Sequence, residues 1–257
     1  MPGSNDKYLA AAAEFISDYI GTLMGCGVHT SRVVRNANRM AQALEVELHI
    51  SVFHRTVIMA VRRGEEAMHS EIVEIPTIPI NFMFNSELSA LSWEALDRHL
   101  PLAAVKEKFD KIMSTPRISH NIVWFMAAAA NASFCRLFEG DWLSTLIVFV
   151  ATLVGFGVKT WLHNRQTNLH AMIIVTAFVS SLVAAVSTLF DTTSDIAITT
   201  SVLFLIPGVP LINGVIDVME GYILTGFARL TKAFLLILCI AVGLALTLWI
   251  VKSKLII

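Results

Sequence analysis

Charged residues are scarce in the second half of this chain. The 257 residues include 19 Lys and Arg and 20 Asp and Glu, but only 13 of these charges follow Arg117. Hydrophobic residues make up 55% of the sequence, and the mean hydropathy is +0.67. Such an excess excludes one water-soluble domain, and its uneven distribution predicts two parts. We expect a water-soluble domain over residues 1–117 and a transmembrane domain over residues 118–257.

Residues typical of metal, disulfide or catalytic sites are few and scattered. The three cysteines, Cys26, Cys135 and Cys239, form no CxxC pair. The eight histidines show no HxxxH or HExxH spacing, and GxSxG, P-loop and dinucleotide fingerprints are missing. We therefore predict no metal, no cofactor, no catalytic residues and no enzymatic activity. The net charge of −1 gives no argument for a nucleic-acid partner.

The first residues lack a basic segment followed by an apolar core. This pattern predicts no cleavable signal peptide, so we expect the soluble domain to stay in the cytoplasm. Within it, apolar periodicity predicts a helix over residues 7–24 and a second one opening at His29. Strands are expected over 45–53, 55–62 and 71–75, and helices near 86–98 and 101–114. These elements favour an α+β domain with helices layered on one small antiparallel sheet.

Five apolar segments follow, each close to the roughly 20 residues that cross a bilayer. They cover about 119–138, 142–162, 169–190, 196–218 and 231–251. Lys and Arg gather at the flanks that face the same side as the soluble domain, and such flanks are cytoplasmic. We therefore expect a multi-pass protein of the inner (plasma) membrane, a five-helix bundle with the C-terminus outside. An odd number of spans suggests that a second polypeptide completes the machinery.

The fourth segment is interrupted by two prolines, a glycine, an amide and a carboxylate: Pro207, Gly208, Pro210, Asn213 and Asp217. Lipid cannot satisfy freed backbone groups, so a broken helix occurs there only where protein or a wet cavity covers it. Discontinuous helices with polar residues beside the break build the binding sites of many secondary transporters. The pattern predicts a broken fourth helix that carries substrate or coupling residues.

Asp217 has two interpretations that the sequence does not separate. It lies one helical turn after Asn213, so it could carry a coupling proton beside a substrate-binding amide. It could equally be a structural acid paired with Arg229 or Lys232. Asn131, an amide deep in the first predicted span, needs polar partners and is a further candidate.

The fourth segment resembles the signature of the threonine/serine exporter family. The resemblance rests on the run 205–217, followed by Gly221, Thr225-Gly226 and Ala228-Arg229, and on Phe134–Trp142. The soluble part is similar from Gly27 through the hairpin 51–64 to Ile80-Asn81. On this resemblance Gly221 and Arg229 join the candidate substrate or coupling residues.

Full-length members of that family carry a cytoplasmic domain and about ten spans. This chain resembles the larger subunit of a split type, in which a second short membrane protein supplies the other five. The resemblance implies export of a small carboxylate or amino acid, in the succinate or threonine/serine class, by a proton-driven secondary transporter. A higher oligomer is possible. A membrane-anchored hydrolase and a regulatory membrane subunit remain alternatives, and the substrate stays open.

The predicted orientation can be tested with reporter fusions. A reporter active only in the periplasm should give signal when fused to Ile257, because the C-terminus is expected outside. The same reporter fused after Arg165, in a loop expected inside, should be silent. The reverse pattern would contradict the orientation.

Overall fold

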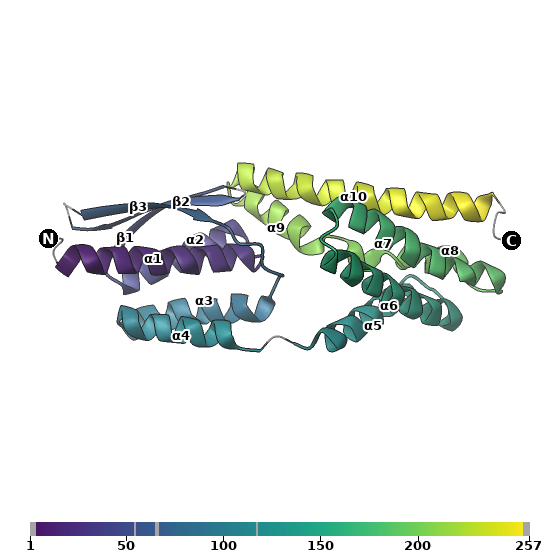
Figure 1. Cartoon of the computed structure of the whole chain (residues 1–257), viewed down its shortest axis with the longest axis horizontal. Helices are drawn as coiled ribbons and strands as arrows, with labels where there is room; N and C mark the ends of the chain where they lie inside the picture. Colours follow the sequence, from purple (N-terminus) through teal and green to yellow (C-terminus); the bar gives the residue numbers. More distant parts are fainter. Residues whose placement is uncertain (1–3, 54, 65–66, 117, 254–257) are drawn as a thin grey trace. The chain divides into compact units, whose positions relative to one another are not determined.

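A computed structural model describes residues 4–53, 55–64, 67–116 and 118–253. Met1, Arg117 and Ile257, which bound the two predicted domains, lie outside the described residues. The chain divides into two units. Figure 1 shows the order of the helices and strands along the chain. Residues 1–116 group with 209–231 in the first unit, and residues 117–208 group with 232–257 in the second.

The first unit begins with four helices and one sheet. Its helices are α1 (Ser4–Gly25), α2 (Thr30–Ala43), α3 (Phe82–Asp97) and α4 (Leu102–Ser114), and its strands are β1 (Glu47–Val52), β2 (Thr56–Arg63) and β3 (Ala67–Glu74). The strands pair antiparallel in the order β1-β2-β3, with Val57 opposite Val73. The small antiparallel sheet expected from the sequence is therefore present, and each helix lies close to its predicted range.

The core of this unit lies between α1 and one face of the sheet. Alternate residues of β2, Val57, Met59 and Val61, are fully buried, whereas Ile58 faces outward. This alternation is the period of two that a strand imposes on a half-buried sequence. Tyr19 of α1 is also fully buried, and its hydroxyl donates a 2.8 Å hydrogen bond to the Leu88 carbonyl of α3. Burial raises the pKa of Tyr19, so the phenol remains a donor.

Two later segments complete the first unit: most of α9 (Gly208–Met219) and the first turns of α10 (Ile223–Lys252). The two helices touch where Gly214 faces Gly226. A Cβ on Gly226 would lie 2.7 Å from the Gly214 carbonyl oxygen and 2.8 Å from the Val218 nitrogen. Glycine is therefore required at this crossing. Between the helices the chain reverses at Gly221, whose φ of +88° favours glycine.

Among its described residues, the second unit contains helices and 3-10 turns joined by short connections. It contains α5 (His120–Leu137), α6 (Trp142–Asn164), α7 (Leu169–Ala184) with the 3-10 turn η1 (Ala185–Leu189), α8 (Ser194–Thr200), η2 (Leu203–Leu205) and the rest of α10. Three helical stretches, 142–164, 169–189 and 223–252, are long and apolar enough to span a membrane. The helix α5, expected as the first span, is not among them.

A fourth span is possible only as a bent pair. The segments Ser194–Leu205 and Gly208–Met219 qualify together and are bent by 64° at the break between them. Pro207 precedes α9 and Pro210 lies in its first turn, where a missing N–H removes no intrahelical hydrogen bond. The break predicted from the prolines is therefore present, and its position follows from proline's tolerance for helix starts.

The glycine crossing of α9 and α10 gives a stability prediction with an internal control. Gly226→Ala should lower the free energy of unfolding by about 1–3 kcal/mol, because its Cβ meets backbone atoms that cannot move away. Gly208→Ala should change it by less than about 1 kcal/mol, because no atom lies within 4 Å of the new Cβ among the described residues. Thermal unfolding in detergent measures both, and equal effects would contradict the crossing.

Candidate functional site

Polar side chains of α9 and α10 converge on the connector between α1 and α2. The carboxylate of Asp217 is fully buried. Its Oδ1 accepts a 2.7 Å hydrogen bond from the Thr30 backbone N–H, and its Oδ2 accepts one of 3.0 Å from the Thr30 hydroxyl. Nη1 of Arg229 lies 3.1 Å from the same Oδ2. All three partners are donors or cations, so they bind the ionised carboxylate.

The carboxylate of Asp217 supplies the hydrogen-bond acceptor that the start of α2 lacks. The first N–H groups of a helix have no intrahelical partner, and a capping side chain usually accepts from one of them. His29 occupies the N-cap position of α2 without a side-chain cap hydrogen bond. The carboxylate from α9 takes this role from a distance of 187 residues in sequence. Its negative charge is also favourable at the positive end of the helix dipole.

Neighbouring side chains bind the carbonyl groups of the same connector. Nδ2 of Asn213 donates a 2.7 Å hydrogen bond to the Gly27 carbonyl, and Nη2 of Arg229 donates one of 3.2 Å to the Val28 carbonyl. Asn213, Asp217 and Arg229 therefore satisfy successive backbone groups from Gly27 to Thr30. We call these three side chains and this connector the α9 clamp.

An outer ring of charge surrounds the α9 clamp. Glu220 lies 3.6 Å from Nδ1 of His29 and 3.8 Å from Nη1 of Arg35. Burial lowers the pKa of His29, while the carboxylates of Glu220 and Asp217 act in the opposite direction. Because the lowered pKa favours the neutral imidazole near pH 7, Arg35 is the constant cationic partner of Glu220.

The α9 clamp contains one contact that the sequence analysis considered. Asp217 does pair with Arg229, as the structural interpretation required. The positive φ of Gly221 reflects the chain reversal after α9. Gly208 differs, because among the described residues neither a positive φ nor a close neighbour requires glycine there. Sequence reasoning missed Gly27 and Thr30, because their partners lie in a distant helix and no local pattern marks them.

Asn131 belongs to a second polar cluster, inside the second unit. Its Nδ2 lies 2.7 Å from the Thr152 hydroxyl and 3.5 Å from the Ser201 carbonyl. The hydroxyl of Ser180 donates to the same carbonyl at 2.8 Å. Ser201 caps the C-terminal end of α8, so side chains from two other helices bind the backbone where α8 ends, before η2. Oδ1 of Asn131 is buried without a hydrogen-bond partner among the described residues.

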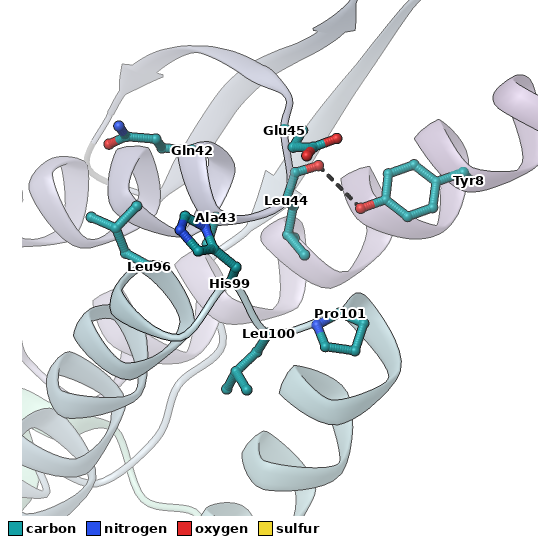
Figure 2. A pocket seen from close by; sticks show the side chains of 9 residues that line it. All are labelled: Tyr8, Gln42, Ala43, Leu44, Glu45, Leu96, His99, Leu100 and Pro101. Carbon is teal, nitrogen blue, oxygen red and sulfur yellow. Dashed lines mark hydrogen bonds between the residues drawn. The ribbon is translucent and has the colours of Figure 1, made fainter.

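The first unit also contains a cavity of about 440 Å³ between the ends of α2 and α3. Figure 2 shows its lining, which comprises Tyr8, Gln42, Ala43, Leu44, Glu45, Leu96, His99, Leu100 and Pro101. The Tyr8 hydroxyl donates a 3.0 Å hydrogen bond to the Leu44 carbonyl. Glu45 and His99 have φ of +55° and +49°, values that non-glycine residues rarely adopt. The cavity has the size of a small-molecule site, and none of the predicted site residues line it.

The α9 clamp predicts that stability depends strongly on the ion pair between Asp217 and Arg229. Arg229→Gln should lower the free energy of unfolding by about 3–5 kcal/mol, because it leaves the buried carboxylate of Asp217 without its cation. Glu220→Gln is the matched control at the exposed rim, and it should lower the free energy of unfolding by less than about 1 kcal/mol. Thermal unfolding and membrane abundance measure both, and similar losses in the two variants would contradict a buried pair.

The sequence is similar to a known protein family and to several named relatives. The family model of the threonine/serine exporters matches residues 15–251. A protein of Klebsiella aerogenes named "Probable succinate transporter subunit YjjP" is 33% identical over 175 residues, which cover 66% of this chain and 67% of that protein. Its Escherichia coli K12 namesake is 36% identical over 156 residues, 58% of this chain and 60% of that protein.

A longer relative comes from Mycobacterium tuberculosis. This "Probable threonine/serine exporter" is 24% identical over 255 residues, which cover 96% of the chain described here but only 47% of the relative. No solved structure matches. The names of these relatives describe transporters, and the apolar helices of the second unit agree with a membrane location. Because the family model covers nearly the whole sequence, this chain belongs to the threonine/serine exporter family.

Proposed function

We propose that this chain is a subunit of a secondary transporter that exports a small carboxylate or amino acid, driven by the proton gradient. Family membership and the names of the relatives support export. The structural observation that carries the proposal is the break between α8 and α9, with the Ser201 carbonyl at the end of α8 held by Ser180 and Asn131. Discontinuous helices with satisfied backbone groups are how many transporters build sites within the membrane.

The proposed membrane topology keeps the five segments expected from the sequence. The bent pair of α8 and α9 would count as the fourth span, and α5, with 18 residues, would be a short first span. Residues 1–117 would lie in the cytoplasm and residues 118–257 would form the transmembrane domain, with the C-terminus outside the inner membrane. In this topology the α9 clamp lies at the cytoplasmic end of the fourth span.

We propose that a second membrane subunit completes the transporter. Two relatives are named as subunits, and the longer mycobacterial relative matches this chain over only 47% of its own length. A partner with five spans would supply the remaining helices, and the pair could assemble into a higher oligomer. Both cargo classes named in the relatives carry a carboxylate, so a carboxylate is the group that the transporter must recognise.

The candidate residues divide between two proposed roles. Pro207, Gly208 and Pro210 would shape the break, and Asn131 would line the membrane part of the path. Asn213, Asp217 and Arg229 would link the connector between α1 and α2 to α9 and α10 through the α9 clamp, and Gly221 would allow the chain to reverse after α9. If Asp217 carries the coupling proton, protonation weakens its pairing with Arg229, because a neutral carboxyl no longer attracts the guanidinium as an ion.

A regulatory role is the second candidate, and the α9 clamp itself favours it. The polar residues of the signature bind this chain's own backbone, so a partner could form the path alone while this chain controls it. Reconstitution into vesicles distinguishes the two functions. We expect cargo efflux only when both subunits are present. Efflux by the partner alone would favour the regulatory role, and efflux by this chain alone would contradict the need for a partner.

The broken helix gives a second test in the same vesicles. Pro207→Ala combined with Pro210→Ala restores backbone donors and favours a continuous helix. We expect this variant to insert normally and to lose export. Efflux normalised to the amount of inserted protein is the measurement, with Pro101→Ala in the soluble part as the control that retains export. Normal export by the double variant would show that transport does not need the helix break.

A further inference from the structure

The cavity of about 440 Å³ in the first unit, here called the α2–α3 cavity, lies at the C-terminal ends of two helices. Gln42 and Ala43 line it from the last turn of α2 and Leu96 from the last turn of α3, while Glu45 and His99 follow the two helices (Figure 2). The last carbonyl groups of a helix give its C-terminus a partial charge of about −0.5. The cavity therefore receives the negative ends of two helix dipoles.

The local sequence keeps both helix ends negative. Lys, Arg and His often occupy the last turn of a helix, where they compensate its dipole. The last turns of α2 and α3 contain no basic residue, and that of α3 contains Glu94 and Asp97. Arg98, the C-cap of α3, pairs with Glu94 at 3.0 Å. Glu45 then adds a carboxylate to the cavity lining itself.

Hydrogen-bond acceptors lie at the edge of the cavity nearest α1. The Tyr8 hydroxyl donates its proton to the Leu44 carbonyl, so its oxygen can accept from another donor. The Glu45 carboxylate can only accept. A cation of the chain already uses this edge, because the Arg63 guanidinium lies 4.6 Å from the centroid of the Tyr8 ring and 3.2 Å from the Glu45 carboxylate. This pair of side chains therefore suits a nitrogen cation.

The α2–α3 cavity is open to solvent on its polar side. The Glu45 side chain is 80% exposed, and Gln42 and His99 are exposed as well. A ligand can enter without any movement of the helices. The other lining groups are apolar and offer a surface for a short alkyl chain: Ala43, Leu44, Leu96, Leu100 and Pro101.

We propose that the α2–α3 cavity binds a small primary ammonium compound, with its ammonium group on Glu45 and Tyr8 and its alkyl part against Leu96 and Leu100. A carboxylate at the same place would meet Glu45 and two negative helix ends, which is unfavourable at close range. Amines should therefore bind more tightly than amino acids or dicarboxylates. None of the candidate transport residues lines this cavity, so the site does not rest on the proposed export function.

Thermal unfolding of the full-length chain in detergent tests the site with propylamine, which is an ammonium ion near neutral pH. The melting temperature should rise and the response should saturate. At a tenfold excess over the dissociation constant, the rise should be roughly 2–5 °C. Propan-1-ol has nearly the same size without the charge, and propionate carries the opposite charge, so neither should give a rise. Potassium chloride at equal ionic strength distinguishes an organic ammonium ion from any cation.

Matched variants assign the response to the α2–α3 cavity. Glu45→Gln removes the carboxylate and should raise the dissociation constant of propylamine at least about tenfold. Glu74→Gln removes the same charge from an exposed position at the end of β3 and should leave binding unchanged. Ala43→Phe fills the cavity without changing the charge and should abolish the response.

Glu45→Gly separates a ligand-binding role from a structural one, and it remains informative if Ala43→Phe does not fold. Both helices end with the hydrogen bond typical of a glycine terminus, from Val46 N–H to the Ala41 carbonyl and from Leu100 N–H to the Ala95 carbonyl. Glycine suits the φ of +55° at Glu45. The variant without ligand should therefore melt roughly 2–4 °C higher than the wild type, while its affinity for propylamine falls at least about tenfold.

The outcomes decide the inference without any measurement of transport. A saturable response that weakens in Glu45→Gln and Glu45→Gly but not in Glu74→Gln supports the ammonium site. No saturable response of the wild type to propylamine, an equal response in Glu45→Gln, or an equal rise with potassium chloride would overturn it. Each of these results leaves the proposed export function to its own test in vesicles.

Discussion

A single buried charge determines how the first unit is assembled. Asp217 is fully inaccessible, and an isolated carboxylate in that position would be strongly unfavourable. It is tolerated because the start of α2 and Arg229 approach it from different parts of the chain. Any arrangement that separates these parts leaves a buried ion, a buried helix end or a buried guanidinium without a partner. The position of α9 against the connector therefore follows from electrostatics as much as from apolar packing.

In the second unit, neutral side chains rather than charged ones bind a buried backbone group. The Ser201 carbonyl lies at the end of α8, and neutral side chains bind it: the Ser180 hydroxyl and the Asn131 amide. Asn131 directs its N–H₂ group toward two acceptors, because the Thr152 hydroxyl already donates its own proton to Val148. The two units thus bind unpaired backbone groups differently: the first uses an ion pair together with an amide, and the second uses an amide and a hydroxyl without charge.

Much of the fold could be predicted from the sequence because it depends on local periodicity. The alternation of Val57, Met59 and Val61 marks a strand, and Pro207 with Pro210 marks the helix break. The partner of Asp217 on α10 was one of two interpretations, since Arg229 lies only 12 residues away in sequence. The role of Thr30 could not be found in this way, because 187 residues separate it from Asp217 and any threonine at a helix start looks the same. Likewise, the segment 119–138 was expected as a span, yet α5 is not among the helices long and apolar enough to cross a membrane, and its buried Asn131 depends on partners in α6 and beyond.

The first unit is discontinuous in sequence, and this has a consequence for biosynthesis. Its last segment, residues 209–231, follows the helices α5 to α8. On the ribosome, residues 1–116 therefore emerge well before the carboxylate that caps α2 and the amide that binds Gly27. The nascent N-terminal part must wait, with the start of α2 uncapped, until the intervening helices have been synthesised. Closure of this long loop makes the last folding step non-local and slow, and it links completion of the first unit to successful synthesis of the second.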